Sequence, residues 1–66
     1  MSANESLGAL HELQERFRSR SDELERLPQA EGRDDAAIDI LNDLAEIAKQ
    51  ILAEVQRARA SADAGA

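Results

Sequence analysis

Residues 37–62 read AIDILNDLAEIAKQILAEVQRARASA, and apolar side chains recur in this stretch at alternating steps of four and three residues. This spacing is a heptad seam, which is typical of a helix that packs along another helix. The seam consists of Ala37, Leu41, Leu44, Ala48, Ile51, Val55, Ala58 and Ala62. It predicts that the second half of the chain is one long amphipathic helix.

The apolar face of this helix is wider than the seam alone. Ile40 and Ile47 flank the seam on one side, and Ile38, Ala45 and Leu52 flank it on the other. At about 100° per residue, the face covers roughly half of the helix circumference. A single neighbouring helix cannot cover that width, and the chain has room for only one other long helix. The sequence therefore points to a second chain.

The first half of the chain predicts another helix, over about residues 3–27. Ser2 and Glu5 match a capping box at its start, and Asn4 is an equally good cap. Pro28 ends the helix, because proline disfavours helical geometry in the residue before it. Large apolar residues hold heptad spacing between these points, namely Leu10, Leu13, Phe17, Leu24 and Leu27, with Leu7 beside them.

Residues 28–34 form the expected loop, and the second helix is expected over about residues 35–60. Asp34 or Asp35 is its predicted cap. Arg57 and Arg59 are predicted to lie near the C-terminal end of this helix, where the helix dipole favours cations.

Residues 61–66 contain no large apolar side chain and are predicted to be a disordered tail. The two helices match in length. The sequence therefore predicts an all-α fold with one domain over residues 1–66, a two-helix antiparallel hairpin that dimerises into a four-helix bundle.

Length and composition favour oligomerisation. In a chain of 66 residues, a lone core rarely supplies more than about 3–5 kcal/mol, so small folds recruit disulfides, metals or further chains. The chain has no Cys and only one His, His11, which we expect to be solvated. No Asp or Glu lies three residues before His11, as a di-iron bundle site would require. We expect no metal site, no cofactor and no catalytic residues.

Charge and hydropathy bear on partners and location. Eight Lys and Arg stand against 14 Asp and Glu, a net charge of −6 that repels a phosphate backbone. We therefore expect no nucleic-acid partner. Residues 1–5 lack the basic start of a signal peptide, and no window approaches the roughly 20 apolar residues of a membrane span. These features predict a cytoplasmic protein with no membrane partner, and the preference for Arg over Lys suggests a GC-rich bacterial genome.

Arg20 interrupts the apolar seam of the first helix and is a candidate partner contact. Folding the hairpin about its loop places Arg20 level with Asp39, Asn42 and Asp43. It either forms a polar layer that fixes the register of the helices or offers its guanidinium to a partner. Phe17 is the only aromatic residue, and we expect its ring to pack against the small side chains of the second helix at Ala45 and Ala48.

The predicted function is that of a small non-enzymatic interaction module, a regulator, adaptor or assembly factor, acting as a homodimer. One alternative is an antitoxin-like or accessory subunit that docks its apolar face onto a larger protein. Another is a dimeric nucleic-acid-binding bundle that gathers Arg16, Arg18 and Arg20 on one side. The predicted interface residues are Ile38, Ile40, Leu41, Leu44, Ile47, Ala48, Ile51, Leu52, Val55 and Phe17.

Overall fold

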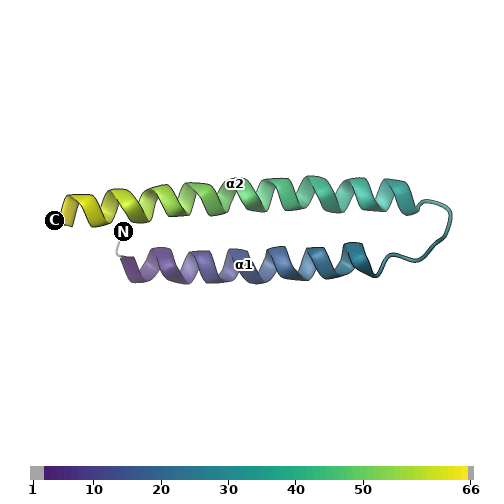
Figure 1. Cartoon of the computed structure of the whole chain (residues 1–66), viewed down its shortest axis with the longest axis horizontal. Helices are drawn as coiled ribbons and strands as arrows, with labels where there is room; N and C mark the ends of the chain where they lie inside the picture. Colours follow the sequence, from purple (N-terminus) through teal and green to yellow (C-terminus); the bar gives the residue numbers. More distant parts are fainter. Residues whose placement is uncertain (1–2, 66) are drawn as a thin grey trace.

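The computed structural model describes residues 3–65 and consists of two antiparallel helices joined by a loop (Figure 1). Helix α1 spans Ala3–Glu25 and helix α2 spans Arg33–Gly65. The Cα atoms extend over 54 × 14 × 12 Å, the dimensions of two helices lying side by side. The predicted all-α hairpin is confirmed.

The loop over residues 26–32 reverses the chain direction. The amides of Arg26 and Leu27 still donate to the carbonyls of Asp22 and Leu24, at 3.0 and 3.4 Å, so the last turn of α1 tightens towards Pro28. Gly32 then adopts a φ of +85°, in the left-handed region where a residue with a Cβ is strained.

The cap of α2 differs from the prediction. The Gly32 carbonyl accepts the first helical hydrogen bond from the Ala36 amide at 3.1 Å, so Gly32 holds the cap position. Asp34 and Asp35, the predicted caps, lie inside the first turn of the helix. Their carboxylates still lie where the helix dipole favours negative charge.

The predicted disordered tail is also corrected, because α2 continues to Gly65. Alanine has the highest helix propensity, and Ala alternates with other residues from Ala58 to Ala64 without any proline. Arg57 and Arg59 consequently lie before the last turn, which contains no basic residue. Ser2, the predicted cap of α1, and Ala66 lie outside the described residues, while Asn4 lies exposed within α1.

Helix α1 covers one side of α2 and creates a narrow core there. The large side chains buried in it are Leu13 of α1 and Ile40, Leu44 and Ile47 of α2, each 8% exposed or less. The inner row of α2, which we define as the buried or half-buried residues at heptad spacing from Ala37 to Ala58, consists of Ala37, Ile40, Leu44, Ile47, Ile51, Glu54 and Ala58. These positions alternate steps of three and four residues, as expected for packing along one helix.

The inner row is not the seam that the sequence predicted. Ile40 and Ile47, predicted as flanks, lie at the centre of the core, whereas Leu41 and Ala48 of the predicted seam are exposed. The packing buries Ile40 and Ile47 in place of a leucine and an alanine, so it removes more apolar surface from water at these two positions. At a third position, half-buried Glu54 takes the place of Val55.

Contacts between the helices fix their register. The Arg20 Nε donates to Asp43 Oδ2 at 2.7 Å across the hairpin. Glu23 and Ile40 line one shallow depression between the helices, and Arg16 and Ile47 line another. In an antiparallel pair with equal rise per residue, the contact of Arg20 with Asp43 places Phe17 about level with Glu46.

We predict that Ile47→Ala lowers the free energy of unfolding by about 3 kcal/mol, because truncating a buried isoleucine loses apolar contacts and leaves a cavity. Ile47 is 3% exposed, the most deeply buried large side chain. Urea unfolding followed by far-ultraviolet circular dichroism, at one protein concentration for all variants, measures the change. Lys49→Ala is the control, because Lys49 is exposed, and should stay within about 0.5 kcal/mol of wild type. If both variants lost the same free energy of unfolding, the assignment of Ile47 to the buried inner row would be wrong.

Candidate functional site

A second apolar row on α2 remains uncovered by α1. The outer row consists of the exposed residues Ile38, Leu41, Ala45, Ala48, Leu52 and Val55. Ile38, Leu41 and Leu52 are each more than half exposed, and Val55 is 36% exposed. The residues alternate steps of three and four, so they form a second complete heptad row beside the inner one.

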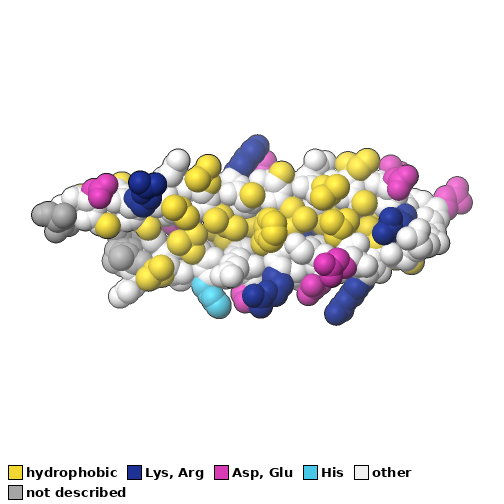
Figure 2. Space-filling view, viewed as in Figure 1, with side chains coloured by type: hydrophobic (Ala, Val, Ile, Leu, Met, Phe, Trp, Pro, Cys, Tyr) yellow, Lys and Arg dark blue, Asp and Glu magenta, His cyan; other side chains and the backbone are white. Residues whose placement is uncertain are grey.

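The outer row lies on the face away from the Arg20–Asp43 contact. Counting about 100° per residue, it is centred roughly 100° around α2 from the inner row and nearly opposite Asp43. The same count places Leu7 and Phe17 on the flank of α1 that lies away from Arg20, and both are exposed, at 62% and 37%. Figure 2 shows the resulting surface, a band of hydrophobic side chains that runs along the molecule over both helices.

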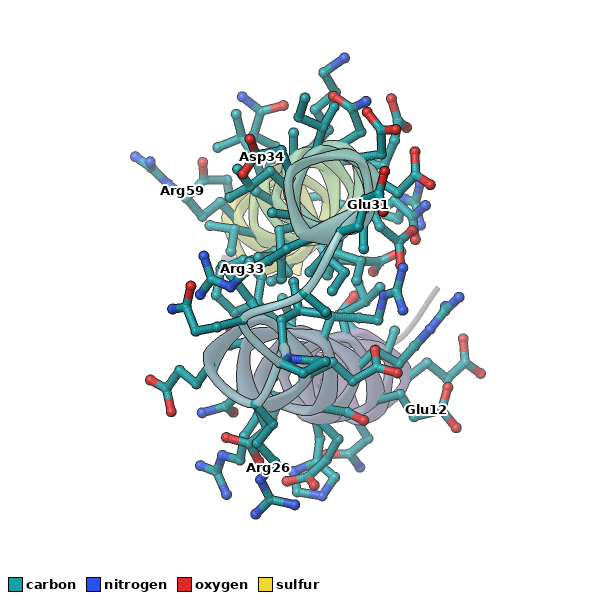
Figure 3. All side chains as sticks on the ribbon, turned by 90° about the vertical axis from the view of Figure 1, so that its right-hand side faces the viewer. Glu12, Arg26, Glu31, Arg33, Asp34 and Arg59 are labelled. Carbon is teal, nitrogen blue, oxygen red and sulfur yellow. The ribbon has the colours of Figure 1, made fainter. Side chains whose placement is uncertain are left out.

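Opposite charges end the outer row. Asp34 lies four residues before Ile38, and Arg59 lies four residues after Val55, so both continue the heptad spacing. Both are exposed. Figure 3 shows Asp34 and Arg59 on the same side of the molecule, with Glu12 and Glu31 on the other. Within residues 3–65, neither Asp34 nor Arg59 forms an ion pair.

The hairpin exposes more surface than a compact protein of its mass. Its accessible surface is 5040 Å², whereas a compact monomer of 7.2 kDa exposes about 4100 Å². The excess of about 900 Å² is close to the roughly 800 Å² that each partner buries in a standard protein–protein interface. Part of the excess reflects the elongated shape.

Arg20, the candidate partner contact, forms hydrogen bonds within the hairpin itself. Its guanidinium donates from Nε to Asp43 at 2.7 Å and from a terminal nitrogen to Glu23 at 2.6 Å. The hydrogen bond to Glu23, and then that to Asp43, raise the pKa of Arg20 above its ordinary value. The sequence correctly placed Arg20 level with Asp43, and the contacts favour a polar layer that ties α1 to α2.

The predicted interface residues divide into two groups. Ile40, Leu44 and Ile47 are buried under α1, and Ile51 is half-buried in the same row. The exposed group consists of Ile38, Leu41, Ala48, Leu52, Val55 and Phe17. Phe17 is 37% exposed, and Ala45 and Ala48, the predicted packing partners of its ring, are exposed as well, so the ring is not enclosed in the core of the single hairpin.

Other candidate sites have less support. His11 is exposed, and no group of ligating side chains within residues 3–65 could hold a metal ion. Arg16 and Arg18 are exposed, and Arg18 lies 3.9 Å from Glu15, so the charge of Arg18 is partly offset. Neither helix, over the same residues, is long and apolar enough to cross a membrane.

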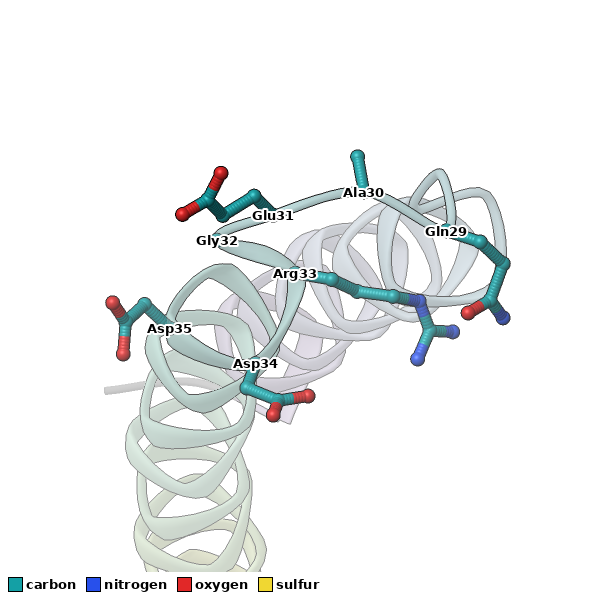
Figure 4. Close-up of a pocket in the computed structure, with 7 residues that line it drawn as sticks. All are labelled: Gln29, Ala30, Glu31, Gly32, Arg33, Asp34 and Asp35. Carbon is teal, nitrogen blue, oxygen red and sulfur yellow. The ribbon is translucent and has the colours of Figure 1, made fainter.

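The loop forms an open hollow lined by residues 29–35 (Figure 4). Arg33 extends across it towards Gln29, while Glu31 and Asp35 point away from Arg33. The polar side chains that line the hollow therefore do not converge on one point, whereas the polar groups of a ligand pocket do.

Comparison of the chain with protein-family models, with curated proteins and with solved structures found no match. The apolar surface and its charged ends therefore carry the functional argument.

The contact between Arg20 and Asp43 should give a favourable coupling free energy that weakens in high salt, since it joins partly exposed charges. A double-mutant cycle with Arg20→Gln and Asp43→Asn, measured by urea unfolding at low and high salt, tests this. The matched pair is Lys49 and Glu46, whose charges lie 3.4 Å apart within one helix and are more exposed; its coupling should be smaller. If the coupling free energy between Arg20 and Asp43 were zero at low salt, this contact would not stabilise the packing of α1 on α2.

Proposed function

We propose that this chain is a non-enzymatic protein–protein interaction module that acts as a homodimer through its outer row. The exposure of Ile38, Leu41 and Leu52 carries the proposal. Six large hydrophobic side chains are exposed among the described residues and only four are buried, so the hairpin alone exposes more of its large apolar side chains than it fully buries. Contiguous exposed apolar surface of this kind marks an interaction site.

A second hairpin fits this surface. The outer row follows heptad spacing over a straight helix, and another helix with the same spacing can interdigitate its side chains with it. From Asp34 to Arg59 the row is about 37 Å long, which is enough for several layers of such packing. Two hairpins joined in this way form a four-helix bundle, in which each α2 is covered by its own α1 and by the second copy.

We predict that the chain sediments at about twice 7.2 kDa at micromolar concentration, because the dimer removes the outer row from water. Analytical ultracentrifugation over a concentration series measures the mass. Leu52→Asp should raise the dissociation constant at least about a hundredfold, because the interface then buries two unpaired carboxylates.

Gln50→Asp is the matched control, because it introduces the same carboxylate at an exposed position roughly 160° around α2 from Leu52. Its dissociation constant should stay close to that of wild type. A folded wild-type monomer at these concentrations would overturn the homodimer. A poorly helical monomer that folds only when a different protein is added would favour the accessory-subunit alternative instead.

A further inference from the structure

We infer that two copies of this chain pack their outer rows antiparallel, about a two-fold axis that passes between Ala45 and Ala48. The inference rests on the proposed function, since it specifies how the same surface is used. It identifies the partner of the outer row as a second copy in one defined register. Three observations support it: the order of residues along the row, the charges at its ends and the level of Phe17.

The order of residues is symmetric about the middle of the row. With its charged ends, the row runs Asp34, Ile38, Leu41, Ala45, Ala48, Leu52, Val55, Arg59. A two-fold dimer brings each position against the one equally far from the axis on the other copy. Leucine then meets leucine at Leu41 and Leu52, β-branched Ile38 meets β-branched Val55, and alanine meets alanine at the centre.

The ends of the row complete the match by charge. The same symmetry brings Asp34 of one copy level with Arg59 of the second copy, and it does so twice per dimer. Both side chains are exposed and free of ion pairs within the described part of the hairpin, so both are available. Charged residues that flank an apolar helix seam set the partner and its orientation.

Neighbouring registers are disfavoured. A two-fold axis half a heptad nearer the start of α2 would bring Asp34 against Leu52 of the second copy. An axis half a heptad nearer the end would bring Arg59 against Leu41. Each shift loses both ion pairs and places charges against apolar side chains, which costs desolvation without compensation. The row therefore specifies one register against its nearest alternatives.

Phe17 gives an independent indication of the same axis. It lies about level with Glu46, between Ala45 and Ala48 and close to the axis, on the flank of α1 that shares the face of the outer row. The two-fold axis therefore brings the two copies of Phe17 close together, beside the alanines of both α2 helices. Large rings then lie where the opposing side chains are smallest, an arrangement that fills the centre of a bundle. It also accounts for an aromatic ring that the single hairpin leaves 37% exposed.

Charge reversal tests the register. Asp34→Arg and Arg59→Asp should each weaken the homodimer about tenfold, because two attractive contacts become repulsive. The doubly substituted chain should recover the wild-type dissociation constant to within about threefold. An equimolar mixture of the two single variants should form a heterodimer in preference to either homodimer, because both contacts are then attractive again. Sedimentation equilibrium, with one variant carrying a fluorophore, measures the dissociation constants of the two single variants, the double variant and the heterodimer.

Asp35→Arg is the matched control for Asp34→Arg. It makes the same change in the first turn of α2, at a position about 100° around the helix from Asp34, so any effect through the helix dipole is shared. It should leave the dissociation constant unchanged. The register would be wrong if the wild type dimerises but the single reversals leave the dissociation constant unchanged. It would also be wrong if the double substitution fails to restore the wild-type constant. In both cases the homodimer itself would remain supported. A wild-type monomer would overturn the homodimer itself.

Discussion

The structure depends on the width of the apolar face of α2. Two complete heptad rows lie side by side on this one helix, the inner row under α1 and the outer row in solvent. A helix covers only one such row of its neighbour. The hairpin therefore packs only one of the two rows, and both the small size of its core and the position of its exposed hydrophobic side chains follow from that constraint.

The ion pair between Arg20 and Asp43 matches the row that α1 covers. Arg20 reaches Asp43 only when α1 packs on the flank of α2 that carries Ile40 and Ile47. The same packing turns Asp34, Leu41 and Arg59 away from α1. The ion pair thus contributes more to the orientation of the two helices than to the free energy of folding, since partly exposed pairs are individually weak. Orientation is what leaves one apolar row available to a second chain.

Periodicity and breakers in the sequence were sufficient to predict the two helices, the loop and the level of Arg20 against Asp43. The division of the wide face could not be predicted, because the predicted seam ran between the two rows and shared Ala37, Leu44, Ile51 and Ala58 with the inner one. Only the packing of α1 resolves that ambiguity. The symmetric order from Asp34 to Arg59 was visible in the sequence as heptad spacing, but the predicted seam grouped Leu41 with Leu44 and so concealed it. The two corrections at the ends of α2 have local causes. A glycine takes the cap position in place of an aspartate, and alanines extend the C-terminal end of the helix.

In the proposed dimer, the outer row of one chain is covered by the outer row of another. Isotope-filtered nuclear Overhauser measurements on an equimolar mixture of labelled and unlabelled chains test this packing, because they detect only contacts between different molecules. We expect intermolecular contacts between the methyl groups of Leu41 and Leu52, and between the Phe17 ring and Ala48. Intermolecular contacts confined to other residues, or none at concentrations where the chain is helical, would contradict this packing.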